Sequence, residues 1–172
     1  MAIWFNLKPV NDLAFFDTAP IRLTYTMHLN ASADAVWAGL VAEKPLAWCK
    51  ALDGKYTSPR PFGVGTTRAV GANFNLVQLQ ERFFVWDDDK RTHAFYVEKC
   101  NAPAFERFAE HYEITPAEQG CKFVWKFALS GRPGLGLLLK LSNPIAKRVL
   151  FDGFIRDTEN KFGTLSATKF ES

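Results

Sequence analysis

Hydrophobic and polar side chains alternate along residues 21–29, and every second side chain on one face is apolar: Ile21, Leu23, Tyr25, Met27 and Leu29. A period of two is typical of a strand with one buried face. From Ser32 onward the apolar residues recur at helical spacing instead. We therefore expect a strand at 21–29, followed by a short helix that Ser32 caps and that ends near Pro45.

Between residues 54 and 130 the pattern is one of apolar runs interrupted by glycine, proline and acidic residues. The runs that predict strands are 66–70, 74–86, 91–100, 105–115 and 122–129. The last three connections are short, at 87–90, 101–103 and 117–120. Short connections join neighbouring antiparallel strands, so this region predicts an antiparallel meander. Asp53-Gly54 before it predicts a loop.

The last predicted strand has the clearest alternation in the chain, with Phe123, Trp125 and Phe127 on one face and lysines on the other. Farther on, Asn143-Pro144 has the composition of a helix start. The apolar residues that follow form a broad helical stripe, which includes Phe154. We expect one long helix from Pro144 to about Leu165.

Composition narrows the class of protein. Of the 172 residues, 48% are hydrophobic and 15% aromatic, which indicates a folded chain with a large core. The net charge is only +3, and the basic residues are scattered, so nucleic-acid binding is not expected. No run of apolar residues is long enough to cross a bilayer, and the N-terminus does not have the pattern of a secretory signal. We expect a cytoplasmic protein without stable membrane insertion.

Three short segments are similar to a known superfamily. They are residues 33–37 at the start of the first helix, 62–68 before a strand, and 120–125 entering the last strand. With the order of elements, they resemble the START/Bet v 1-like (SRPBCC) superfamily, in particular its polyketide cyclase/dehydrase and lipid-transport group. The resemblance implies an α+β helix-grip fold, in which a curved antiparallel sheet of six to seven strands wraps around a long C-terminal helix. Residues 21–168 would form this domain, and residues 1–20 an extension.

The resemblance also implies a cavity between the sheet and the helix. On the predicted faces, the side chains expected to contact a ligand there are Tyr25, Arg68, Phe95, Phe108, Tyr112, Phe123, Trp125, Phe127 and Phe154. One register is open: a four-residue turn at 117–120 places Tyr112 opposite Trp125, whereas a three-residue turn with a bulge places Glu113 there. We favour Tyr112. The aromatic residues of the last strand could equally be plain core.

Few residues suggest chemistry. Arg68 at a cavity mouth could hold a carboxylate or a phenolate through paired N–H donors, although a surface arginine is the alternative. His93 and His111 are acid/base candidates if they face the cavity, whereas the alternation places His28 on the solvent side. The three cysteines are widely spaced and predict small apolar core residues, neither disulfides nor a zinc site. No metal or cofactor is expected.

Two functions remain open at this stage. A carrier or sensor of a small hydrophobic molecule, such as a lipid, a polyketide or an aromatic compound, needs only an apolar cavity. A cyclase, aromatase or dehydratase also needs titratable polar groups that converge inside that cavity. We favour the carrier, and the polar content of the cavity is the observation that separates the two.

Overall fold

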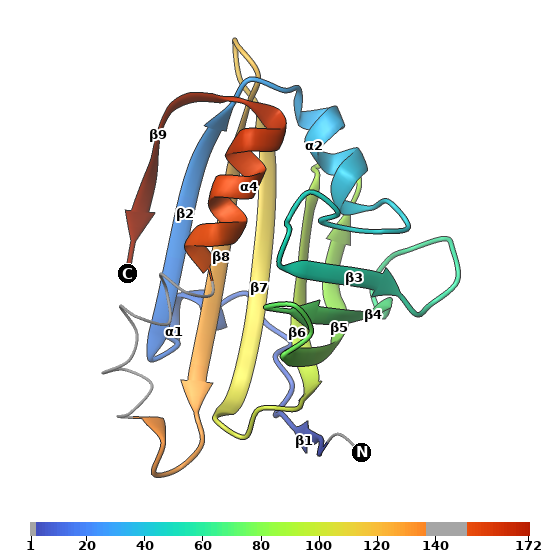
Figure 1. Ribbon diagram of the computed structural model, residues 1–172, viewed down its shortest axis with the longest axis vertical. Helices are drawn as coiled ribbons and strands as arrows, with labels where there is room; N and C mark the ends of the chain where they lie inside the picture. Colours follow the sequence, from blue (N-terminus) through green and yellow to red (C-terminus); the bar gives the residue numbers. More distant parts are fainter. Residues whose placement is uncertain (1–2, 137–150) are drawn as a thin grey trace.

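The computed structural model describes residues 3–136 and 151–172 (Figure 1). In chain order the elements are β1 (Phe5–Asn6), α1 (Phe15–Thr18), β2 (Ile21–Leu29), α2 (Ala33–Leu40), β3 (Leu52–Tyr56), β4 (Thr67–Ala72), β5 (Val77–Asp87), β6 (Thr92–Cys100), β7 (Phe105–Pro116), β8 (Cys121–Gly131), α4 (Asp152–Phe162) and β9 (Thr164–Glu171). No helix in these two ranges is long and apolar enough to cross a membrane.

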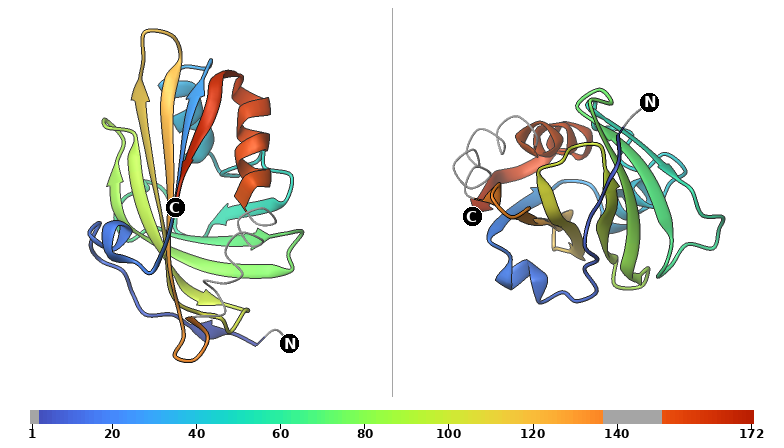
Figure 2. Two further views of the ribbon diagram at one scale, coloured as in Figure 1. Left: turned by 90° about the vertical axis from the view of Figure 1, so that its left-hand side faces the viewer. Right: turned by 90° about the horizontal axis from the view of Figure 1, so that it is seen from below.

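The strands form one antiparallel sheet in the order β3-β4-β5-β6-β7-β8-β2-β9, and β1 pairs with β6. The sheet curves, and α4 lies on its concave side (Figure 2). The helix-grip arrangement is therefore confirmed, whereas the count of six to seven strands is wrong: the described residues form nine. The additional strands are short or terminal, and pairing with neighbouring strands stabilises them where local sequence does not.

Strand β3 replaces the loop predicted at Asp53-Gly54. Its five residues contain a glycine and an aspartate, which are rare in strands and common in turns. The segment is nevertheless extended because it pairs with β4 along its whole length, from Leu52 opposite Ala72 to Tyr56 opposite Arg68. Tertiary pairing therefore overrides local preference here.

The C-terminal helix ends earlier than predicted. It ends at Phe162, and Gly163 has a positive φ of 74° that turns the chain into β9. Leu165 consequently lies on a strand that pairs with β2, and not in the helix. The expected helix start at Pro144 lies outside the described residues.

Helix α2 is the short helix predicted after residues 21–29. It begins as predicted, because the Ser32 side chain accepts a hydrogen bond from the Ala35 backbone N–H. It ends at Leu40, earlier than the predicted end near Pro45, and a turn follows in which the Cys49 N–H donates to the Leu46 carbonyl. Residues of the N-terminal segment that precedes β2 pack on the outer face of the sheet, where Phe16 contacts the ring of His111. All three cysteines are buried and free.

The register of β7 and β8 places the aromatic side chains. Pro116 pairs with Cys121, so the loop has the four residues 117–120, and Tyr112 lies opposite Trp125. The favoured register is thus confirmed. Tyr25 of β2 pairs with Trp125 from the other side. One aromatic row, Tyr25, Trp125 and Tyr112, therefore crosses three strands of the inner face.

Candidate functional site

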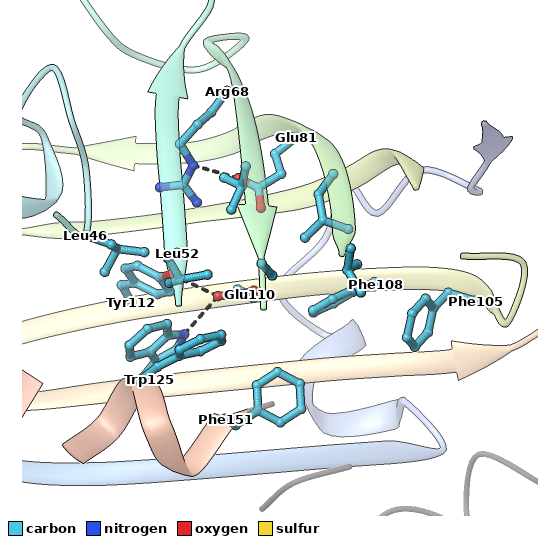
Figure 3. Close-up of a pocket in the computed structure, with 15 residues that line it drawn as sticks. Leu46, Leu52, Arg68, Glu81, Phe105, Phe108, Glu110, Tyr112, Trp125 and Phe151 are labelled. Carbon is cyan, nitrogen blue, oxygen red and sulfur yellow. Dashed lines mark hydrogen bonds and ion pairs between the residues drawn. The ribbon is translucent and has the colours of Figure 1, made fainter. Parts of the chain in front are cut away.

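A cavity of about 70 Å³ lies between the inner face of the sheet and α4 (Figure 3). Most of its lining is apolar: Leu46, Leu52, Val70, Ala72, Val77, Leu79, Phe105, Phe108, Trp125, Phe151 and Phe154. Four polar side chains complete the lining: Arg68, Glu81, Glu110 and Tyr112. A mostly apolar cavity with a few polar groups is the usual form of a small-molecule site.

Five of the nine side chains expected at the ligand line this cavity: Arg68, Phe108, Tyr112, Trp125 and Phe154. The other four lie in the core beside it. Phe123 and Phe127 stack against the two sides of Trp125, with ring centroids 5.8 and 5.3 Å away. Phe95 lies under the Arg68 guanidinium, and the Tyr25 hydroxyl donates to Asp152 Oδ1 at 2.9 Å. These four side chains therefore support the residues that line the cavity and do not line it themselves.

Arg68 is enclosed in the wall, and not at a cavity mouth as expected. It pairs across β4 and β5 with Glu81, and its Nε donates to Glu81 Oε2 at 2.6 Å. Both side chains are about 2% exposed. The guanidinium lies 4.4 Å from the centre of the Phe95 ring, and its Nη1 is buried without a hydrogen-bond partner in the described structure. A charged donor group is thus held in place by one acceptor and an aromatic surface.

Glu110 is the third ionisable residue of the wall. Its Oε2 accepts hydrogen bonds from the Tyr112 hydroxyl and from Trp125 Nε1, both at 2.9 Å. No described residue donates to its Oε1, although the side chain is only 8% exposed. The carboxyl group is therefore fixed through Oε2 by the two neighbours that the dashed lines in Figure 3 mark, while Oε1 has no donor among the described residues.

Burial and nearby charge change the protonation of these groups. Burial, together with the Glu81 charge, raises the pKa of the Glu110 carboxyl to about 8, against the opposing effects of Trp125, Arg68 and Tyr112. Burial also raises the pKa of Glu81, which Arg68 opposes. For Arg68, burial lowers the pKa, but Glu81, Tyr56 and Tyr112 together outweigh burial and raise it, so the guanidinium stays charged. Because a lone buried guanidinium is costly, Arg68 and Glu81 form an ionised pair.

Tyr112 remains protonated over the same range of pH. Burial raises the pKa of its hydroxyl well above the usual value, and the Glu110 charge adds to this effect. At neutral pH the polar wall therefore carries one positive charge on Arg68, one negative charge on Glu81, and neutral Glu110 and Tyr112.

The histidines do not line the cavity. His93 is fully buried among the rings of Trp37, Phe83 and Tyr112, and neither ring nitrogen has a hydrogen-bond partner among residues 3–136 and 151–172. Burial, with the Arg68 charge, lowers its pKa well below the usual value. His111 lies on the outer face, where its Nε2 is 3.0 Å from the Thr92 hydroxyl, and His28 is half-buried on the polar side of β2.

Sequence reasoning missed Glu81 and Glu110 as members of the site. Both alternate with apolar residues that face inward, since Glu81 lies between Leu79 and Phe83 and Glu110 between Phe108 and Tyr112. This alternation was the feature of the sequence that could have identified both glutamates as inward-facing. Charged residues are almost never fully buried unless they are paired, and the pairing is visible only in the folded sheet.

Comparison with known proteins agrees with this architecture. The family model for polyketide cyclase/dehydrase and lipid transport matches residues 20–156. The uncharacterized protein Rv2574 of Mycobacterium tuberculosis is 32% identical over 146 residues, which cover 80% of this chain and 85% of that protein.

Two solved structures show the same fold at low sequence identity. Ginseng major latex-like protein 151 from Panax ginseng is 12% identical, with a TM-score of 0.64 over 83% of this chain and 97% of that chain. The Zhui aromatase/cyclase from Streptomyces sp. R1128 is also 12% identical, with a TM-score of 0.59 over 83% and 96%. On the family match and the fold, the chain belongs to the polyketide cyclase/dehydrase and lipid-transport family.

Proposed function

We propose that the chain binds a small hydrophobic molecule in the cavity between the sheet and α4, as a carrier or a sensor. The observation that carries the proposal is the cavity itself, with apolar walls on most sides and polar side chains gathered on one. Burial of apolar ligand surface, at roughly 25 cal/mol per Å², supplies the affinity. A volume of about 70 Å³ favours a compact ring, such as an aromatic compound, over a long acyl chain.

The proposal predicts that a neutral single-ring compound, toluene, binds and changes the tryptophan emission. Trp125→Ala removes the largest aromatic surface of the cavity and should weaken this binding by about tenfold or more, measured by fluorescence titration. Trp4→Ala is the control, because Trp4 is partly exposed and does not line the cavity. Equal affinity of a cooperatively unfolding Trp125→Ala variant and the wild type would contradict the proposal.

A second candidate is an enzyme of the cyclase, aromatase or dehydratase type. The observation that favours it is that Arg68, Glu110 and Tyr112 converge on one wall, which the carrier function does not require. A protonated carboxyl group beside a guanidinium can polarise a carbonyl group and donate a proton to it. The Zhui structure is that of an aromatase/cyclase, and this likeness supports the idea at the level of fold.

The two candidates differ in what happens to a ligand that co-purifies with the protein. If the chain is an enzyme, the wild type should convert this compound to a new product, detected by mass spectrometry. Glu110→Gln and Tyr112→Phe should then lower the rate by about 10²–10⁴-fold, with a much smaller change in ligand affinity. Recovery of the unchanged compound after prolonged incubation with the wild type would favour the carrier.

A further inference from the structure

We infer that the ligand is uncharged and carries a carbonyl oxygen, which accepts hydrogen bonds from Arg68 and Glu110, and that Glu81 excludes carboxylates. This inference rests on the proposed function, because it assumes that the cavity is occupied by a small molecule. It differs from the expectation based on Arg68 alone, which favours an anionic ligand.

The charges in the wall of the cavity already balance one another. Arg68 is already neutralised by Glu81 at 2.6 Å, and both side chains are buried. The only other acidic side chain in the described part of the lining is Glu110, whose carboxyl group is neutral at neutral pH. A ligand carboxylate would therefore add a second negative charge near the Glu81 carboxylate, in a site where low polarity strengthens repulsion. The described wall thus accommodates a neutral head group better than an anion.

Arg68 and Glu110 offer hydrogen-bond donors to a ligand in the cavity. Arg68 Nε donates to Glu81, and Arg68 Nη1 is buried without a hydrogen-bond partner, so the two N–H groups of Nη1 have no acceptor among the described residues. Glu110 Oε2 already accepts two hydrogen bonds, which leaves Oε1 as the position for the proton of the neutral acid. Figure 3 shows the two groups directed into the cavity, Arg68 from β4 and Glu110 from β7. A carbonyl oxygen has two lone pairs and can accept from both.

The surroundings of Glu110 determine how binding depends on pH. The titratable or charged groups that influence it within the described structure are Arg68 on β4, Glu81 on β5, Tyr112 on β7 and Cys49 after α2. From β6, His93 packs beside Tyr112 and is neutral. Burial raises the pKa of Cys49 to about 12, so Glu110 alone in this set titrates near pH 8. Once it ionises, the donor to the ligand is lost.

The first test compares three molecules of similar size at pH 6.5: acetophenone, ethylbenzene and benzoate. Calorimetric titration should show acetophenone binding about tenfold more tightly than ethylbenzene, and benzoate at least tenfold more weakly than acetophenone. Benzoate binding as tight as acetophenone, or acetophenone no tighter than ethylbenzene, would overturn the inference. If neither ethylbenzene nor toluene binds, the proposed function itself fails, which is a different result.

The second test uses pH. The affinity for acetophenone should fall about tenfold between pH 6.5 and 9.5 in the wild type, whereas Glu110→Gln should make the affinity independent of pH. Glu113→Gln is the matched control: Glu113 lies on the same strand but on the outer face, where its carboxylate contacts Lys126 at 3.0 Å. This control should retain the fall. An unchanged pH dependence in Glu110→Gln would contradict the role of Glu110.

The third test is a gain of binding. Glu81→Gln removes the negative charge that balances Arg68, so the affinity for benzoate should rise at least tenfold while that for ethylbenzene changes little. Thermal unfolding establishes whether the variant is folded. If it is not, the ratio of acetophenone to benzoate affinity in the wild type decides the question. A folded Glu81→Gln variant with unchanged benzoate affinity would show that Glu81 does not exclude anions.

Discussion

Arg68→Met should lower the free energy of unfolding by about 3–5 kcal/mol, because it leaves the Glu81 carboxyl group without its partner in the protein interior. The Arg68 and Glu81 side chains are only 1% and 2% exposed, so water cannot replace the lost partner. Methionine fills much of the arginine stem volume, which limits the contribution of an empty cavity to the loss. Urea denaturation monitored by tryptophan fluorescence measures the effect.

A matched control lies one strand position away from the buried pair. Arg82 Nε contacts Glu98 Oε1 at the same distance of 2.6 Å, but these side chains are 43% and 30% exposed. Arg82→Met should therefore cost less than about 1 kcal/mol. The double variant Arg68→Met/Glu81→Leu should recover most of the stability, since no charge is left unpaired. Equal losses in the two single variants would show that burial does not determine the strength of these pairs.

The expected recovery of stability in the double variant suggests that the Arg68–Glu81 pair has a role other than stabilising the fold. A buried ion pair is seldom more stabilising than apolar residues of similar volume. Its presence in the wall of a cavity is therefore poorly explained by stability alone, and the unpartnered Arg68 Nη1 adds a further cost. Recognition of a polar group on the ligand explains both features, because the ligand supplies the missing acceptor.

The sequence predicted the central part of the fold because alternation and turn length are local properties. The four-residue loop at 117–120 fixes the register of β7 and β8, and it correctly placed Tyr112 opposite Trp125. Strands β3 and β9 could not be predicted in this way. The first has the composition of a turn, and the second follows a helix whose apolar pattern continues past Phe162 to Leu165.

The site was predicted in its aromatic part and missed in its acidic part. Trp125 belongs to the clearest apolar face of the chain, so its inward orientation follows from alternation. Glu81 faces inward by the same rule, but it is acceptable there only because the β4–β5 register places Arg68 opposite it. Sequence periodicity indicates which way a side chain points, whereas the partner that makes a buried charge tolerable depends on strand pairing.

The stability of the protein should fall by about 2 kcal/mol between pH 6.5 and pH 8. In this range an unfolded chain has an ionised Glu110, with an ordinary pKa near 4.5, whereas the folded chain keeps the proton because its pKa is about 8. The folded state thus binds more protons, and each pH unit costs about 1.4 kcal/mol until the folded carboxyl ionises. Below pH 6.5 the buried neutral His93 has the opposite effect, since only the unfolded chain binds its proton.

Glu110→Gln should remove most of this loss, because glutamine does not titrate and its amide oxygen can still accept from Tyr112 and Trp125. Chemical denaturation at pH 6.5 and pH 8.0 gives the two free energies for each variant. Glu113→Gln serves as the control. Its carboxylate is partly exposed, and the hydrogen bond from Lys126 and the His111 charge outweigh partial burial and lower its pKa, so this variant should keep the full loss. A wild-type stability that is constant between the two pH values would mean that Glu110 is already ionised in the folded protein.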